Sequence, residues 1–223
     1  MKNNLNILYE DNHLIVVVKP YNVLSQSDNT KDIDMLTIIK NYIKEKYNKP
    51  GNVYLGLVHR LDRPTGGIMV FAKTSKAASR LSKQIKDNKF TKKYLAVVHG
   101  ILEKKENILV NYLKKDENNN SLITNEKEGK YAKLHYKVLK ENKDYSVLDI
   151  LLETGRHHQI RVQLKNIGHP LYGDQRYGIN DKKQLGLFAY HLEFYHPVTK
   201  EKLIFEYMPK EEIFKWKNIK EYY

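Results

Sequence analysis

The stretch LVHRLDRPTGGIMVFAKT, residues 57–74, carries the strongest structural signal in this chain of 223 residues. Its apolar ends predict two short strands, Leu55 to Leu61 and Ile68 to Ala72, because both runs are rich in residues that favour extended backbone. The Pro-Thr-Gly-Gly sequence between them is typical of a tight turn, since proline fixes φ and glycine adopts conformations closed to other residues. The pattern therefore predicts a strand–turn–strand unit with a polar segment at the end of its first strand.

Asp62 lies in that polar segment, and Arg60 and Arg63 stand close to it in the sequence. A carboxylate that must stay ionised and nucleophilic beside an anionic substrate needs a nearby cation, which an arginine can supply. An aspartate before a turn more commonly accepts hydrogen bonds from local backbone amides. The spacing alone leaves both interpretations of Asp62 open.

Apolar periodicity on both sides of this unit predicts further elements. Amphipathic helices are expected over Asp34 to Tyr47 and over Ser75 to Lys86, the second capped by Thr74 or Ser75. The other predicted elements are strands at 7–9, 14–18, 93–98, 134–139, 145–152, 188–194 and 202–207, and helices at about 157–166 and from residue 209 onward. Many strands with interspersed helices but no regular alternation favour an α+β sheet protein over a doubly wound one.

We expect one domain over residues 1–223, because no internal repeat, proline-rich linker or clear boundary divides the chain. This length is enough for one sizeable core. Residues 104–130 are polar and rich in Asn, Lys and Glu, which predicts a polar insertion or mobile hairpin there.

The composition predicts a polyanionic partner. The chain has 39 basic and 26 acidic residues, a net charge of +13 and a sequence pI of about 9.5, which favours nucleic acid first and an acidic membrane surface second. Only six of the basic residues are arginines, and five of these fall within residues 57–74 and 154–178. This clustering predicts that the arginines lie at sites that require a planar guanidinium with five N–H donors.

Several classes of protein are excluded by what the sequence lacks. The chain has no cysteine, which excludes disulfides, thiolate catalysis and cysteine-based metal sites. Its longest apolar run, Leu14 to Val18, is too short to span a membrane, and its first residues have no signal pattern, so we expect a cytoplasmic protein.

The block KKYLAVVHG, residues 92–100, predicts an apolar strand that carries one polar-tipped aromatic residue, Tyr94. A tyrosine suits a pocket that grips a flat base, because its ring stacks while its hydroxyl donates or accepts a hydrogen bond. The chain has 17 tyrosines, so ordinary packing is an equally available role for this one. Tyr94 alone therefore predicts no function.

The block TGRHHQIRVQLKNIGHPLYGDQRYG, residues 154–178, predicts a helix capped by Thr154 and Gly155 and followed by a loop. The buried stripe of this helix is expected to contain Ile160, Leu164 and Ile167. A basic row runs beside the stripe and consists of His157, Arg161 and Lys165. Arg161 lies next to the stripe, so it can bury its stem and direct its guanidinium at a partly buried carboxylate or phosphate. A solvated basic face is the commoner meaning of such a row, and the sequence leaves both open.

Other chemistries lack their signatures. The chain has no GxGxxG, HExxH or GxSxG motif, and GDQRYG at residues 173–178 lacks the Lys-Ser/Thr of a phosphate-binding loop. The adjacent His157 and His158 have no partner ligands at metal spacing, so no metal is expected. A glycoside hydrolase needs two carboxylates, and the blocks offer one, Asp62, in a convincing setting.

The chain resembles the RluA-type family of RNA pseudouridine synthases in five segments that occur in the family's order. They are HRLDRPTGG at 59–67, FAKT at 71–74, KKYLAVVHG at 92–100, GRHHQIRVQL at 155–164 and HPLYGD at 169–174. The similarity extends from about Leu14 to about Tyr207. It implies an α+β fold with a curved, largely antiparallel mixed β-sheet, flanking helices and a central basic cleft, and an enzyme that isomerises uridine to pseudouridine in RNA.

The resemblance also implies three catalytic residues: Asp62 as the essential aspartate, Tyr94 as the tyrosine that packs on the target base, and Arg161 as the basic partner of the aspartate. The reaction breaks the N1–C1′ bond of uridine, rotates the base and joins C5 to C1′ without oxidation, so no cofactor is expected. The aspartate either attacks C1′ or C6 or removes a ribose proton so that a glycal forms, and the sequence leaves these mechanisms open.

The target base must leave its stack to reach Asp62, and Arg60 is our candidate for the side chain that fills the vacated space. The other residues expected to bind RNA are Arg63, Arg156, His157, Lys165 and Arg176. The expected partner is structured rRNA or tRNA. We expect a monomer that needs no obligate protein partner and no membrane.

This chain departs from the family's pattern at two positions, because many members carry Thr in place of His157 and His in place of Gln163. Many members also have an N-terminal S4-like RNA-binding domain, which we do not expect here, so target selection falls to the catalytic domain, residues 104–130 and loops near Arg176. The alternatives are a non-catalytic RNA-binding module or chaperone, which would not need Asp62, and a base-excising N-glycosylase, which differs in its product.

Overall fold

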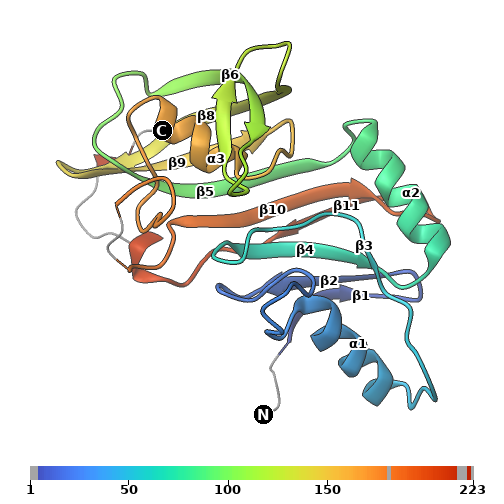
Figure 1. Ribbon diagram of the computed structural model, residues 1–223. Helices are drawn as coiled ribbons and strands as arrows, with labels where there is room; N and C mark the ends of the chain where they lie inside the picture. Colours follow the sequence, from blue (N-terminus) through green and yellow to red (C-terminus); the bar gives the residue numbers. More distant parts are fainter. Residues whose placement is uncertain (1–4, 180–181, 215–219, 222–223) are drawn as a thin grey trace. The chain divides into compact units, whose positions relative to one another are not determined.

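The computed structural model describes residues 5–179, 182–214 and 220–221, and its contacts divide the chain into two compact units (Figure 1). Unit 1 consists of Met1–Phe90 and His191–Tyr207, and unit 2 of Thr91–Tyr190 and Met208–Tyr223. The chain returns from unit 2 to unit 1 inside one strand, β10 (Leu187–Tyr195). A single domain over residues 1–223 stays a prediction.

Unit 1 is built from antiparallel strands and two helices. In chain order it contains β1 (Asn6–Glu10), β2 (Leu14–Lys19), α1 (Met35–Lys46), β3 (Gly56–Leu57), β4 (Gly66–Ala72), α2 (Ser75–Lys86), the second half of β10, and β11 (Lys202–Glu206). β2 pairs with β1 and β4, β3 pairs with β4, and β11 pairs with β10. Every residue of β2 and β4 is buried. Burial on both faces explains why these strands read as continuous apolar runs without alternation, and it confirms both predicted strands.

The core of unit 1 brings its strands and α2 together. Its buried members include Leu14, Val16, Ile68, Val70, Leu81, Phe90, Leu192 and Phe194. Both helices begin where a side chain can accept a hydrogen bond from the first turn. Asp34 caps α1 through the N–H of Thr37, and Thr74 caps α2 through the N–H of Ala77, at 3.2 Å each. Both predicted helices are therefore confirmed.

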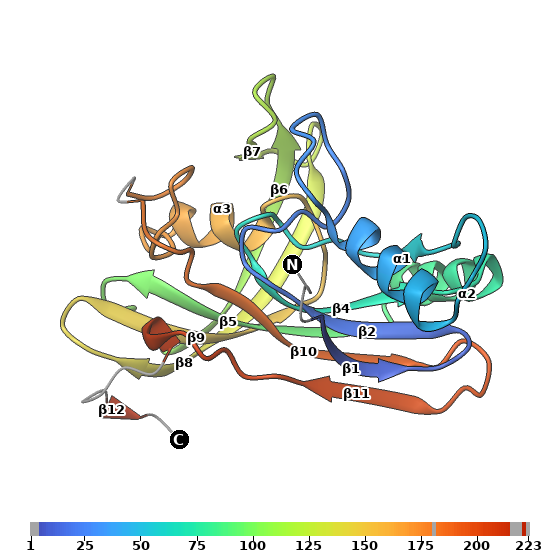
Figure 2. The same cartoon turned by 90° about the horizontal axis from the view of Figure 1, so that it is seen from below.

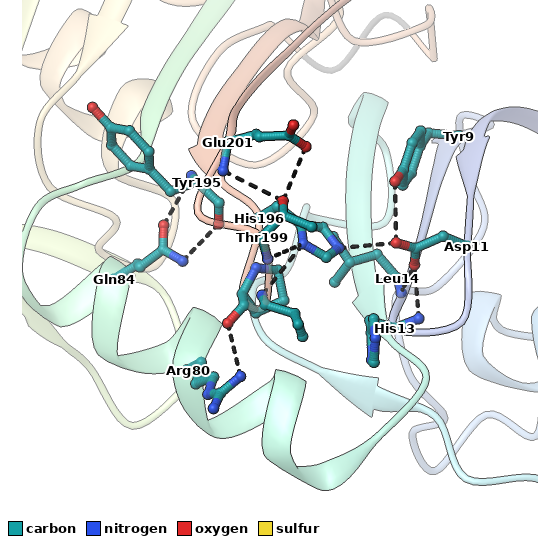
Figure 3. Close-up of polar contacts among 12 residues, drawn as sticks. Tyr9, Asp11, His13, Leu14, Arg80, Gln84, Tyr195, His196, Thr199 and Glu201 are labelled. Carbon is teal, nitrogen blue, oxygen red and sulfur yellow. Dashed lines mark hydrogen bonds and ion pairs between the residues drawn. The ribbon is translucent and has the colours of Figure 1, made fainter.

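A buried histidine joins two turns of unit 1 (Figure 3). Asp11, after β1, accepts two backbone N–H groups of its own turn at 2.7 Å each, and Nε2 of His196, after β10, lies 2.9 Å from the same carboxylate. Nδ1 of His196 accepts the N–H of Thr199 at 3.0 Å. Arg80 of α2 reaches this turn by donating from Nη1 to the carbonyl of Pro197 at 2.9 Å. The one arginine outside the motif blocks thus holds a turn in place.

Unit 2 is a second set of antiparallel strands, in the order β5–β9–β8–β6–β7 (Figure 2). In chain order it contains β5 (Thr91–His99), β6 (Glu106–Lys115), β7 (Ser121–Thr124), β8 (Lys130–Glu141), β9 (Tyr145–Leu152), α3 (Gln159–Asn166), the first half of β10, the 3₁₀ turn Glu212–Phe214, and β12 (Lys220–Glu221). α3 lies against β6 and β7. No helix in the described ranges combines the length and apolar character that crossing a membrane requires.

The strand predicted over Leu55 to Leu61 is wrong beyond its first residues, because β3 covers only Gly56–Leu57. After β3, the N–H of Val70 in β4 donates to Nε2 of His59 at 3.1 Å instead of to a strand partner. The Ser25 hydroxyl takes both backbone groups of Leu61, at 2.7 Å to its carbonyl and 3.2 Å from its N–H. Side chains replace the backbone ladder here, so the segment reaches Asp62 as a loop.

Two other segments bear on the prediction. Residues 104–130, predicted as a polar insertion or mobile hairpin, form an antiparallel hairpin of β6 and β7, and its mobility stays a prediction. The helix predicted from residue 209 is, within the described residues, the short turn Glu212–Phe214, and residues 215–219 lie outside the described part of the chain.

α3 begins later than predicted, and its cap differs. His158 is its N-cap residue and has left-handed backbone (φ 51) without a side-chain cap, so Thr154 and Gly155 do not start the helix. The Thr154 hydroxyl instead donates to Oε1 of Gln159 at 2.8 Å. The predicted stripe is buried at Ile160 and Leu164 and only partly buried at Ile167. Residues 159–164 are all buried, so the helix is enclosed nearly all round and only Lys165 of the basic row is exposed.

Candidate active site

The turn that carries Asp62 connects β3 to β4 in unit 1. It closes through the backbone, because the N–H of Thr65 donates to the main-chain carbonyl of Asp62 at 3.0 Å. Leu61 on one side and Thr65 on the other are buried, whereas the side chain of Asp62 is partly exposed. The loop is therefore fixed by buried residues on both sides of Asp62, and the Asp62 carboxylate lies between them, partly exposed to solvent.

A buried lysine, which the sequence analysis missed, lies under this turn. Lys19 ends β2 and is 0% exposed, and its Nζ donates to the carbonyls of Pro20, Val23 and Arg63 at 2.9, 2.6 and 3.1 Å. Burial lowers the pKa of Lys19 to about 7, the charge of Asp62 opposes this shift, and the charge of Arg63 adds to it. The ammonium group thus fixes the backbone beside Asp62 and supplies positive charge within electrostatic range of its carboxylate. A lysine at the end of the apolar run LIVVVK was the available signal.

The two arginines predicted beside Asp62 both lie on the surface. Arg60 and Arg63 are exposed, and Nη2 of Arg63 forms an ion pair with Asp32 at 2.7 Å. An exposed pair of this kind contributes little to stability. The roles of Arg60 and Arg63 toward RNA stay predictions.

Tyr94 lies in unit 2 on β5, where it pairs with Ile150 of β9 and is 7% exposed. Lys92 is two residues earlier on the same strand and therefore on the same face. Burial lowers the pKa of Lys92, and in the described part of the chain its ammonium has neither a hydrogen bond nor an ion pair. Its Nζ lies 3.4 Å from the position that a Cβ would take at Gly155. The blocks at residues 92–100 and 154–178 thus come together at Lys92.

Arg161 is buried in α3 and is held by a carboxylate that the sequence analysis did not consider. Its Nε and Nη2 donate to the two oxygens of Asp174 at 2.8 and 2.7 Å, and the two residues are 5% and 0% exposed. Although burial would raise the pKa of Asp174, the bonds from Arg161 and from the backbone N–H groups of Tyr177 and Arg176 hold it below its usual value. The motif HPLYGD, which ends at Asp174, was the signal.

Aromatic and polar side chains surround this ion pair. The ring centre of Tyr177 lies 5.1 Å from Cζ of Arg161. The Tyr177 hydroxyl accepts the N–H of Ser121 in β7 at 2.7 Å and lies 2.8 Å from Nδ1 of His158. Burial, followed by the charge of Arg161, lowers the pKa of His158 to about 2, so its imidazole is neutral. The Tyr177 hydroxyl therefore contacts both Ser121 and a neutral imidazole, and the network ties β7 to α3.

The remaining residues predicted to bind RNA lie around this network in unit 2. Arg156 is exposed and its Nε donates to the carbonyl of Tyr131 at 2.8 Å, and Nη1 of Arg176 donates to the carbonyl of Asn119 at 3.4 Å. Nδ1 of His157 lies 3.1 Å from the Ser121 hydroxyl, whereas Lys165 is exposed at the end of α3. Unit 1 therefore carries Asp62, Arg60 and Arg63, and unit 2 carries Tyr94, Arg161 and the other four.

Within the residues that the structure describes, no three His, Cys, Asp or Glu side chains are grouped so that they could hold a metal ion.

Comparison with known proteins assigns the chain to a class. Residues 13–166 match the family model described as RNA pseudouridylate synthase, and the matched range includes Asp62, Tyr94 and Arg161. The chain belongs to this family of RNA-modifying isomerases, and its predicted resemblance to the RluA type is confirmed.

Two curated relatives illustrate the similarity. The chain is 35% identical over 216 residues to an uncharacterized RNA pseudouridine synthase of Aquifex aeolicus, which covers 91% of this chain and 68% of that protein. It is also 35% identical over 219 residues to ribosomal large subunit pseudouridine synthase C of Buchnera aphidicola, with 91% and 67% covered.

The fold agrees with solved structures. Human RNA pseudouridylate synthase domain containing 4 aligns with a TM-score of 0.77 at 20% identity, over 92% of this chain and 89% of that one. Human RNA pseudouridylate synthase domain containing 1 also gives a TM-score of 0.77, at 21% identity. The predicted α+β class with largely antiparallel strands is confirmed, whereas the central basic cleft stays a prediction.

Proposed function

We propose that this chain converts specific uridines of a structured RNA to pseudouridine and that Asp62 acts on a nucleotide flipped out of its stack. The family match across residues 13–166 carries the proposal, because it spans the aspartate, the tyrosine and the arginine together. Ribosomal RNA is the favoured substrate over transfer RNA, since curated relatives are named as ribosomal large subunit pseudouridine synthases. We further propose that the chain acts as a monomer in the cytoplasm.

Three side chains divide the work of the proposed reaction. Asp62 either attacks the nucleotide or removes a ribose proton, and the N1–C1′ bond breaks. Tyr94 packs on the detached uracil while it rotates, and C5 then bonds to C1′ and loses its proton, so the product is an isomer of the substrate. Arg161 keeps Asp62 ionised and oriented, and Lys19 adds a second positive charge near the same carboxylate.

The deciding experiment maps pseudouridine across total cellular RNA with and without this gene. Loss of the signal at one or a few positions of ribosomal RNA supports the proposal, and loss in transfer RNA moves the substrate to that class. Purified protein incubated with the identified RNA then distinguishes the alternatives. Isomerisation leaves the RNA mass unchanged, excision by an N-glycosylase leaves an abasic site, and a binding module or chaperone leaves the RNA unmodified.

Arg60→Ala is expected to lower the rate of modification about tenfold on structured RNA and to change it little on a single-stranded oligonucleotide. Unstacking a base costs a few kcal/mol, and about 1.4 kcal/mol corresponds to a factor of ten, so a lost wedge matters only where a stack exists. Rates on the two substrates are compared in parallel. Lys86→Ala, which removes an exposed charge at the end of α2, is the control. Equal activity of Arg60→Ala and the parent on both substrates would remove the wedge role.

Lys92→Met is expected to raise KM for RNA about tenfold and to reduce the salt dependence of binding by about one charge. A partly buried ammonium without a protein partner is costly, and a phosphate of the bound RNA would compensate its charge. The measurement is KM at several salt concentrations. Lys93→Met changes the neighbour on the opposite face of β5 and serves as the matched control. Identical salt slopes for the two variants would contradict this role.

A further inference from the structure

We propose that Asp174 is the positioning residue for Arg161, an inference that rests on the proposed function. It would fix the direction in which the guanidinium faces the bound nucleotide. Asp174 lies in the loop after α3, thirteen residues from Arg161, and acts through the arginine without touching the reacting atoms.

The geometry of the pair supports positioning. A bidentate contact fixes the plane and the rotation of a guanidinium, whereas a single bond fixes neither. The bonds from Nε at 2.8 Å and Nη2 at 2.7 Å lie on one edge of the guanidinium and use two of its five N–H donors. The other three donors therefore point in directions that Asp174 sets. This matters because a displacement of about 1 Å in a reacting group can cost a factor of about 10² in rate.

The carboxylate that sets this direction is itself held rigidly. Oδ1 of Asp174 accepts the backbone N–H groups of Arg176 and Tyr177 at 3.0 Å each, in addition to the bond from Arg161. The preceding residue, Gly173, has φ +67, and a Cβ there would lie 2.3 Å from the carbonyl oxygen of Gln184. Only glycine fits this close approach, so Gly173 lets the loop pack against Gln184 directly before Asp174. The ring of Tyr177 lies on the guanidinium and completes the enclosure.

The charges around Arg161 indicate why a second carboxylate is needed. His158 is neutral, and the groups besides Arg161 whose charges lower its pKa are His157, Arg176 and Lys115, none of which carries a negative charge. Burial of a guanidinium is costly unless a carboxylate pairs with it. Asp174 supplies such a carboxylate within unit 2, so Arg161 is an oriented donor in a bidentate ion pair.

A double-mutant cycle with Asp174→Asn and Arg161→Met tests the inference, using the full chain and the RNA identified by the mapping experiment. Asn keeps the shape and one acceptor oxygen but loses the charge and the second bond. We expect Asp174→Asn to lower kcat about 100-fold while KM changes less than threefold. In the Arg161→Met background the same substitution should lower kcat less than threefold further, because a residue that acts only through Arg161 has nothing left to position.

A second variant, Asp174→Glu, separates positioning from folding. It keeps the charge but moves the carboxylate by one methylene, so we expect a loss of about tenfold in kcat at a thermal midpoint near that of the parent. Parental kcat in Asp174→Asn, equal losses in both backgrounds, or the failure of both Asp174 variants to fold would overturn the inference. If the parent itself forms no pseudouridine, it is the proposed function that fails, so the two failures are distinguishable.

Discussion

Replacing Asp62 by asparagine is expected to lower pseudouridine formation by at least about 10³-fold while RNA affinity stays within threefold of the parent. The amide keeps the shape of the side chain but can neither attack carbon nor accept a proton, and loss of a central nucleophile or base typically costs factors of this size or more. Pseudouridine is measured by chromatographic separation of nucleosides after complete digestion, and affinity is measured by filter binding.

Two comparisons make this result specific to Asp62. Asp87→Asn removes an exposed carboxylate that pairs with Lys83 on α2, and it should leave both quantities unchanged. The turn at Asp62 closes through its main-chain carbonyl, so the variant should also unfold near the parental temperature. Parental activity in Asp62→Asn would refute the role of the aspartate, whatever the family of the chain.

The elements that the sequence predicted are those whose signal is local. β2 and β4 are short apolar runs with turn residues beside them, and both were found with ends shifted by at most two residues. The two helices of unit 1 begin at Asp34 and Thr74, whose side chains accept bonds from their own first turns. In each case the residues that decide the structure lie within a few positions of the element, so one window of sequence contains the cause.

The parts that the sequence did not predict depend on partners far along the chain. Leu61 lies in a loop because Ser25, 36 residues earlier, takes its backbone groups. For Arg161 the sequence left open a partly buried carboxylate partner and a solvated basic face, and the basic row did not identify Asp174 as that partner. Lys19 directly follows the apolar run of a predicted strand, and this position did not indicate its hydrogen bond to the carbonyl of Arg63, 44 residues away. Motif order still located the region, because Leu61, Arg63, Arg161 and Asp174 lie inside the motif blocks, although Ser25 and Lys19 do not.

Lys19→Met is expected to destabilise the protein by about 2–4 kcal/mol at pH 9 and to lower its activity. The variant leaves buried carbonyl groups without their donor, and each unsatisfied group costs about 1–3 kcal/mol, while removal of a buried amine offsets part of this loss. The carbonyl of Arg63 is one of the three, so the turn that carries Asp62 loses an anchor. Unfolding in urea measures the loss, and Lys86→Met on the exposed end of α2 serves as the control.

The pH dependence of this effect has a definite sign. The pKa of Lys19 is about 7 in the folded chain, against 10.5 in the unfolded chain, so the unfolded state binds more protons between these values. The contribution of Lys19 to the free energy of unfolding is lowest below pH 7 and rises with pH toward 10.5, by about 2 kcal/mol between pH 7 and pH 9. Lys19→Met lacks this increase, so the stability gap between parent and variant should be wider at pH 9 than at pH 6. The other ionisable groups are common to both proteins, so their contributions cancel in the difference between the two free energies of unfolding.

This difference in stability contradicts the expectation if it stays constant or narrows as the pH rises. Lys19 would then keep its charge in the folded chain, and Asp62 would face an ammonium group at every pH at which the protein is folded.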